Sequence, residues 1–294
     1  MSKKPLTRDE QFLAKAAGDD VPMPKPLTRV QEFLERIVER LSGIVTEETL
    51  SNAIAPMNAS IAQLNRKTIQ FRHGKGTFTA TATGTNITWQ YGGQQVQGGS
   101  CTFDVKSDNG LITLECDTIE NLTIQNDAEN KMDLSDLGGK ITNTLNLYNC
   151  SNITGDLSDL GGNTNVLDLY KCSNITGDLS DLGSNTISLN LHNCSNITGD
   201  LSDLGGKITN WLGLNNCINI TGVYYGTKYP KNVNMSKTSV TPADMDTNLI
   251  NFAASGVKSG LFAANGMKRT AASDNAVATL VANGWTVSGL TKEG

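Results

Sequence analysis

The sequence is poor in the residues that most enzymes use. It holds two histidines, His73 and His192, and only 5% of its 294 residues are aromatic. It contains no P-loop, G-x-G-x-x-G, H-E-x-x-H or G-x-S-x-G pattern, the usual signs of phosphate, dinucleotide, zinc and acyl-transfer chemistry. Acid–base catalysis would need a carboxylate pair instead. We therefore expect no enzyme activity and no cofactor.

Positive charge and long apolar runs are scarce as well. The net charge is -5, whereas a nucleic-acid surface usually needs a basic face, so we expect no nucleic-acid partner. No apolar run is long enough to cross a bilayer, which argues against membrane insertion. The opening residues MSKKPLTRDEQ lack a hydrophobic signal segment, which predicts synthesis in the cytoplasm without export by the usual route.

Repetition is what the sequence has in abundance. One phrase, L-x-L-x-x-C-x-x-I-T-G, recurs every 21 to 23 residues, and four copies are nearly identical. A fixed period of this length indicates a solenoid, and the pattern resembles the leucine-rich repeat. Each unit alone cannot bury its leucines, whereas stacked units share one core beside a parallel sheet. The copies begin at Leu145, Leu167, Leu189 and Leu212, with degenerate copies at Leu122 and Val233.

The cysteines and aspartates follow the same period. Four of the six cysteines occupy one position per repeat without any C-x-x-C pair, so we expect buried thiols as small apolar residues and no metal site. Disulfide or metal roles are the weaker alternative. The aspartates of the LSDL segments indicate turn and cap geometry, although a weak cation-binding ladder is the alternative. The two series are Cys150, Cys172, Cys194 and Cys217, and Asp133, Asp136, Asp156, Asp159, Asp178, Asp181, Asp200 and Asp203.

The outward side chains of the repeat strands form the candidate site. Alternation within a strand turns Leu145 and Leu147 inward and Asn146 and Tyr148 outward. Aligned repeats would give a column of Asn or Asp beside a column of rings, suited to a glycan or a peptide strand. The alternative is mutual stabilisation of neighbouring side chains across the sheet. The predicted ligand-binding residues are Asn146, Tyr148, Asp168, Tyr170, Asn190, His192, Trp211 and Asn215.

The first 65 residues have a different character. KPLTRDEQFL and KPLTRVQEFL repeat at Lys4 and Lys25, which predicts short proline-led helices that anchor the chain to a larger partner. Two apolar stripes with 3-4-3 spacing follow and favour a homo-oligomer, with a trimer preferred over a dimer. Packing within one chain is the alternative. The stripes are Leu34, Ile37, Leu41 and Ile44, and then Ile54, Met57, Ile61 and Leu64.

The predicted fold class is α+β, in five segments. An N-terminal anchor repeat (1–29) and a helical, coiled-coil oligomerisation segment (30–65) precede a small antiparallel β-sandwich-like domain (66–118). Leucine-rich repeats (119–240) and a helical C-terminal cap (241–294) complete the chain. Alternating strands such as GTFTATATG predict the β-domain, whereas Thr241-Pro242 predicts the start of a cap helix.

Several of these segments together resemble a known family. The proline-led N-terminal repeat, the WQYGG β-domain, the ITGDLSDL repeats and the TPADMDTNLINFAASGV end are similar to virion fibre proteins of tailed phages of gut bacteria, including the crAss-like group. The piece NITWQYGGQQVQGGSCTFDV also resembles the WDFGDG region of polycystic-kidney-disease-type sandwiches. Here, however, Gln90, Gly93 and Gln94 stand where that region has acidic residues.

The resemblance to virion fibres implies a function and a location. It implies a non-enzymatic head fibre on the capsid surface of a virion, held by its N-terminus to a capsid or other virion protein and contacting a host surface glycan or protein. A tail or baseplate receptor-binding fibre and a bacterial surface adhesin are the alternatives, and a polysaccharide depolymerase ranks third.

Overall fold

A computed structural model describes residues 36, 52, 55–56, 66–162 and 164–293 of the chain. Residues 67–294 form a unit of their own, distinct from residues 1–66. The predicted anchor repeat and all eight residues of the two apolar stripes lie outside the described residues. The account below therefore concerns the second unit, which begins at Lys67.

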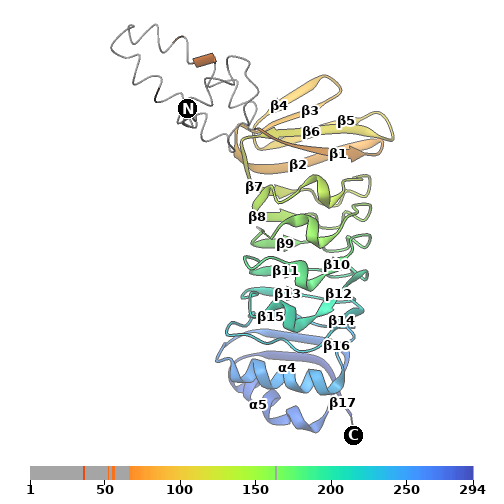
Figure 1. Cartoon of the computed structure of the whole chain (residues 1–294). Coiled ribbons are helices and arrows are strands. Elements are labelled where there is room, and N and C mark those ends of the chain that lie inside the picture. The colour runs from red at the N-terminus through yellow and green to blue at the C-terminus, as the bar shows by residue number, and fades with distance from the viewer. Residues whose placement is uncertain (1–35, 37–51, 53–54, 57–65, 163, 294) are drawn as a thin grey trace, which may run out of the picture. The chain divides into compact units, whose positions relative to one another are not determined.

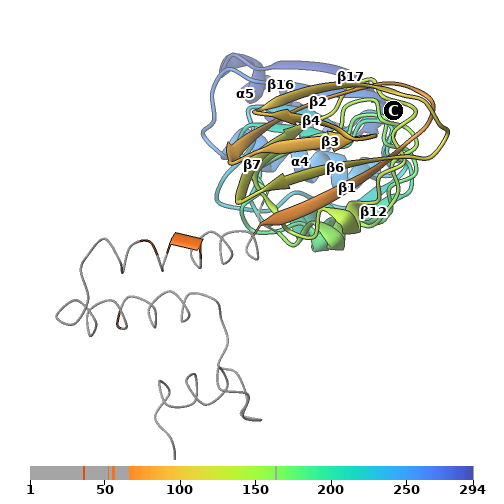
Figure 2. The same cartoon turned by 90° about the horizontal axis from the view of Figure 1, so that it is seen from above.

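Two β-sheets form the N-terminal end of this unit, because their strands alternate inward apolar and outward polar residues. The first sheet has the order β1-β6-β3-β4, and Figure 2 shows these strands side by side. The second contains β7-β2-β5, antiparallel throughout. Phe71, Phe78 and Trp89 are fully buried, with ring centroids 5.7 to 6.3 Å apart. The bounds are β1 Lys67–His73, β2 Gly76–Thr85, β3 Thr88–Tyr91, β4 Gln94–Gln97, β5 Ser100–Val105, β6 Gly110–Cys116 and β7 Thr118–Thr123.

A buried contact between His73 and Asp127 joins the N-terminal sheets to the first coil of the repeats. Nε2 of His73 lies 3.0 Å from Oδ1 of Asp127, and Nδ1 lies 2.6 Å from the carbonyl oxygen of Gly74. Desolvation by burial raises the pKa of Asp127, while the neighbouring His73 opposes this shift. The backbone of Lys131 also donates to the carbonyl of Arg72 at 2.6 Å. The two N-terminal sheets are thus joined to the repeats by polar as well as apolar contacts.

The repeats stack as coils, one short parallel strand per coil (Figure 1). Leu145, Leu167, Leu189 and Leu212 pair in register between successive strands and are buried. The opposite wall of the solenoid carries short 3₁₀ helices and a second parallel sheet, β10-β12-β14. The sheet strands are β8 Ile141–Asn146, β9 Val166–Asp168, β11 Ser188–Asn190, β13 Trp211–Gly213 and β15 Asn232–Asn234. The other wall has η1 Leu134–Asp136, η2 Leu157–Leu160, η3 Leu179–Asp181, η4 Leu201–Leu204, β10 Gly177–Asp178, β12 Ile197–Asp200 and β14 Asn219–Thr221.

The same sheet continues into the C-terminal end with two longer strands. Helix α4 (Pro242–Ala254) begins after Thr241, whose side chain accepts from the backbone N–H of Asp244, as the sequence predicts. Strands β16 (Leu261–Arg269) and β17 (Thr286–Lys292) add in parallel to β15. Between them lie η5 (Ala271–Ser273) and α5 (Asp274–Ala282). The sheet thus reaches ten strands in the order β17-β16-β15-β13-β11-β9-β8-β7-β2-β5.

The predicted α+β class is wrong. The described residues are mainly β, with 17 strands in large mixed sheets and only two α-helices with defined bounds, and they show no N-terminal helical coiled coil. The prediction counted helical patterns in the first 65 residues, nearly all of which lie outside the described residues, and it treated the β-domain as a separate small sheet. In the structure, β2, β5 and β7 belong to the same sheet as the coils. The predicted border at 118/119 falls within β7, and the one at 240/241 falls between β15 and α4.

Candidate functional site

The predicted site residues lie together on the outward face of the ten-stranded sheet. Register pairs place Asn146 beside Asp168, and Asp168 beside Asn190, in successive strands. The next member of this column is Gly213, which pairs with Asn190. Two residues further, in the turn that follows each strand, come Tyr148, Tyr170, His192 and Asn215. Trp211 begins β13 and belongs to a different column.

The rings of this face form a continuous contact series. The Tyr148 and Tyr170 rings are stacked with centroids 4.4 Å apart and planes inclined by 5°. The Tyr170 and His192 rings follow at 5.9 Å and 47°. The Lys171 ammonium lies 5.4 Å from the Tyr170 ring centroid, in cation–π range. The two tyrosine rings thus share faces with each other, and a ligand would meet their edges and hydroxyls.

The Trp211 side chain joins the ring series by lying over Gly213, next to the His192 ring. Its ring centroid lies 5.9 Å from that of His192. A Cβ on Gly213 would lie 2.5 Å from Nε1 of Trp211 and 2.7 Å from Nε2 of His192. Gly213 therefore leaves the space that the indole and imidazole occupy. The candidate site predicted from the sequence does not include Gly213; its place two residues after an outward tryptophan was the available signal.

The Asn and Asp column has a structural task at the strand ends. Oδ1 of Asn146 accepts from the backbone N–H of Tyr148 at 3.0 Å, and Oδ1 of Asp168 accepts from Tyr170 at 3.1 Å. Nδ2 of Asn190 also donates to Oδ1 of Asp168 at 3.0 Å. Such Asx turns explain why short polar side chains recur here. The column supports the geometry of the ring residues that follow it.

At the position that follows each strand by two residues, two side-chain atoms are buried without a hydrogen-bond partner: Nε2 of His192 and Oδ1 of Asn215. Their residues occupy the same position in successive coils. Desolvation by burial lowers the pKa of His192, opposed by the charge of Asp168, so the imidazole is held toward its neutral form. Buried polar atoms without a partner are uncommon in native proteins and often mark a water or ligand position.

On the opposite wall, the repeated aspartates act as caps, as predicted. Asp133, Asp156, Asp178 and Asp200 are N-caps of the 3₁₀ helices, and the aspartate three residues later completes each capping box. Threonine of the following coil also donates to the cap carboxylate, at 2.7 to 2.9 Å for the first three. These carboxylates therefore stabilise turns and link neighbouring coils. No cluster of His, Cys, Asp or Glu suited to a metal ion occurs in the part of the chain that the structure describes.

The repeated thiols form a buried column, also as predicted. Sγ of Cys172 donates to the carbonyl of Leu147 at 3.0 Å, and Sγ of Cys194 donates to that of Leu169 at 3.0 Å. All six cysteines are buried and free. Desolvation raises the pKa of Cys172 to about 12 and that of Cys150 to about 11. Thiols in this state are poor nucleophiles and poor metal ligands at neutral pH.

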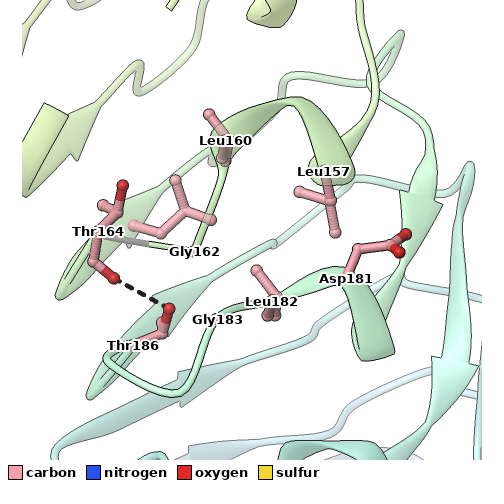
Figure 3. Close-up of a pocket in the computed structure, with 9 residues that line it drawn as sticks. Leu157, Leu160, Gly162, Thr164, Asp181, Leu182, Gly183 and Thr186 are labelled. Carbon is pink, nitrogen blue, oxygen red and sulfur yellow. Dashed lines mark hydrogen bonds between the residues drawn. The ribbon is translucent and has the colours of Figure 1, made fainter. Parts of the chain in front are cut away.

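One gap inside the solenoid, between two of its middle coils, is too small for a ligand. Figure 3 shows a small gap between the coils that carry η2 and η3, where Oγ1 of Thr186 donates to the carbonyl of Thr164 at 3.0 Å. Its volume is about 10 Å³, the space of about one water molecule. Leu157, Leu160 and Leu182 close it with apolar carbon. This gap therefore has no room for a ligand.

Comparisons with known proteins do not assign the chain to a group. No family model, curated protein or solved structure matches it. Among the described residues, no helix has the length and apolar character needed to span a membrane. The geometry of the exposed sheet face is thus the principal guide to function.

Proposed function

We propose that the chain is a non-enzymatic virion fibre protein, positioned on the capsid surface as a head fibre, that contacts a host surface ligand through its repeat sheet. The observation that carries this proposal is the ring series from Tyr148 to Trp211. Three successive strands present the same inward Leu, Leu and Cys, yet their outward ring position holds Tyr148, Tyr170 and His192. A constant scaffold with differing exposed residues suits recognition.

The electrostatic and packing properties of this face support binding to an uncharged or weakly charged surface ligand. Burial holds His192 toward neutrality, and Lys171 lies over a tyrosine ring. The tyrosine edges present hydroxyls, which can both donate and accept hydrogen bonds. Rigid aromatic side chains of this kind lose little conformational entropy on binding. The N-terminal attachment and the trimeric state remain predictions from the sequence.

The first experiment locates the protein in its assembly. Purified virions would be labelled with gold-conjugated antibodies raised against the full chain and viewed by electron microscopy. We expect label on the capsid surface. Label confined to the tail or baseplate would favour a receptor-binding tail fibre, and its absence from virions would overturn the proposal.

The second experiment tests the sheet face. The purified full chain should compete with virions for adsorption to host cells, and a Tyr148→Ala/Tyr170→Ala variant should compete about tenfold less well, since aromatic anchors often dominate an interface. Asn174→Ala, in the turn between the sheet and the opposite wall, is the matched control, because its side chain donates to the carbonyl oxygen of Ser151 and is not part of the ring series. Equal competition by both variants would exclude the ring series as the contact surface.

A further inference from the structure

A hollow at the β3–β4 hairpin, distant in sequence from the repeats, has the chemistry of a second binding site. Its volume is about 240 Å³, and its lining comes from β3, β4, β6 and the Gly92-Gly93 turn. Both turn glycines have positive φ, 56° and 83°, which a two-residue type I′ turn requires. The polar residues of its lining include Gln90, Gln94, Gln95 and Thr113. Gln94 pairs with Tyr91 and so turns its side chain to the other face of the hairpin.

The register of the strands brings these polar groups into one row. Gln90 pairs with Gln95 on one side and with Thr113 on the other. Directly opposed residues of antiparallel strands have Cβ atoms about 4.5–5.5 Å apart on the same face. Trp89, between Thr88 and Gln90, points inward and is fully buried. Gln90, Gln95 and Thr113 therefore face outward together.

These side chains are available to a ligand. Within the described residues, the side chains of Gln90, Gln95 and Thr113 make no hydrogen bond. An amide offers two donors and an acceptor with two lone pairs, and a hydroxyl offers both functions. Several such groups therefore converge on the hollow without satisfying one another.

The lining of the hollow contains no charged residue and has a small apolar surface. Leu111 contributes an aliphatic surface that is 37% exposed, and Tyr91 is fixed because its hydroxyl accepts from the backbone N–H of Lys106 at 2.8 Å. Two charged residues lie on the same face without being part of the lining: Arg72 pairs with Leu111 of the lining, and Glu115 pairs with Thr88. A ligand that complements such a lining has neighbouring hydroxyl groups on one side and an apolar C–H surface on the other.

We propose that this hollow binds one ring of a neutral oligosaccharide. Drug-sized ligands fill about 300–1,000 Å³, so a hollow of about 240 Å³ fits a single residue of a longer chain. The neighbouring units of the saccharide lie along the exposed row toward Gln70, which pairs with Thr113. A peptide would instead need charged partners or a deeper apolar pocket for its side chains.

The experiment measures saccharide binding by the full chain. Neutral tetra- to hexasaccharides of glucose, galactose, mannose and N-acetylglucosamine serve as probes in saturation-transfer difference NMR, followed by titration calorimetry of those that bind. We expect at least one to bind and a Gln90→Ala/Gln95→Ala variant to bind it about tenfold more weakly. Gln97→Ala, on the same strand but outside the lining, should change affinity less than twofold.

Two further variants keep the outcome unambiguous. If the double variant folds poorly by circular dichroism, Gln95→Ala alone, which changes one exposed residue of the row, should also weaken binding. Tyr148→Ala/Tyr170→Ala should leave saccharide binding intact, which separates this site from the sheet face of the repeats. Absence of binding by every neutral probe, preference for uronic acid oligomers or a peptide, or unchanged affinity in both glutamine variants would overturn the proposal.

Discussion

Oγ1 of Thr198 donates a hydrogen bond of 2.9 Å to Oδ2 of Asp178, which lies 20 residues earlier and one coil away. The same carboxylate accepts from the backbone N–H of Ser180 at 3.0 Å. These bonds favour the ionised carboxylate, and the one from the Ser180 backbone is the largest cause that lowers the pKa of Asp178 below its ordinary 3.8. The cap thus couples the local turn to the next coil.

The first prediction concerns acid. Because the pKa of Asp178 is lower in the folded state, its contribution to stability is complete above the unfolded pKa near 4 and is lost as pH falls through the folded value. Asp133 and Asp156 share this direction. We expect the urea midpoint to fall between about pH 5 and pH 2, with a shallower fall in Asp178→Asn. Asp108→Asn, on an exposed β-domain turn, should keep the wild-type slope; equal slopes in all three proteins would contradict the account.

The second prediction concerns the glycine of the ITG phrase. Gly199 has φ +128°, and a Cβ there would lie 2.8 Å from the backbone nitrogen of Leu179 in the preceding coil. Gly199→Ala should lower the free energy of unfolding by about 2 kcal/mol or more, from strain and overpacking. Gly205→Ala is the control, since φ is +51° and the nearest atom is 4.0 Å away. Its cost should be about 1 kcal/mol, from the left-handed backbone alone, and a reversed order in chemical denaturation would refute the prediction.

The third prediction concerns the thiol column. Cys172→Ser should destabilise the protein by about 1 to 3 kcal/mol, because a hydroxyl in this apolar column is incompletely satisfied. Thiol reagents at about pH 8 should label the native unit slowly and all six cysteines after unfolding, since burial raises the pKa of Cys172 to about 12. Chelators should leave the melting temperature unchanged. Loss of structure in a chelator would reveal a metal that these thiols hold.

The fourth prediction concerns the ring series. A Cβ on Gly213 would overlap the indole and imidazole atoms that lie over it. Gly213→Ala should displace Trp211, shift tryptophan emission to the red through greater water exposure, and reduce host-cell competition as the tyrosine variants do. The backbone can accept alanine, so the loss of stability should stay near 1 kcal/mol, a common effect of point mutations. Unchanged emission would mean that Trp211 does not depend on this space.

Periodic features of the sequence could be predicted well. The spacing of Leu145, Leu167 and Leu189 identified the strands and the buried side because each coil meets the same neighbours. Thr241 and Pro242 identified the start of α4 because capping is local. Strand β4 was missed, since QQVQ lacks the apolar alternation of a buried strand and is held instead by the Gly92-Gly93 turn.

Other features depend on contacts that no local pattern reveals. The aspartate caps were predicted, but their bonds to Thr154, Thr176 and Thr198 join residues about one period apart and required the coil register. The crossing of Trp211 over Gly213 depends on an imidazole from the previous coil. The fold class was mispredicted because the helical patterns at the N-terminus were given the same weight as the strands. The sequence also did not show that these strands belong to one large sheet.

The identical inner contacts of neighbouring coils make the protein adjustable in length. The steps from Leu145 to Leu167 and from Leu167 to Leu189 are both 22 residues (167 - 145 and 189 - 167), and each coil offers its successor the same leucines, thiol, glycine and cap. If one 22-residue repeat were lost or duplicated in the gene, the coils on either side would still present matching surfaces to each other. Each event would change the reach of the unit by one strand spacing, about 4.8 Å, and would add or remove one exposed ring position.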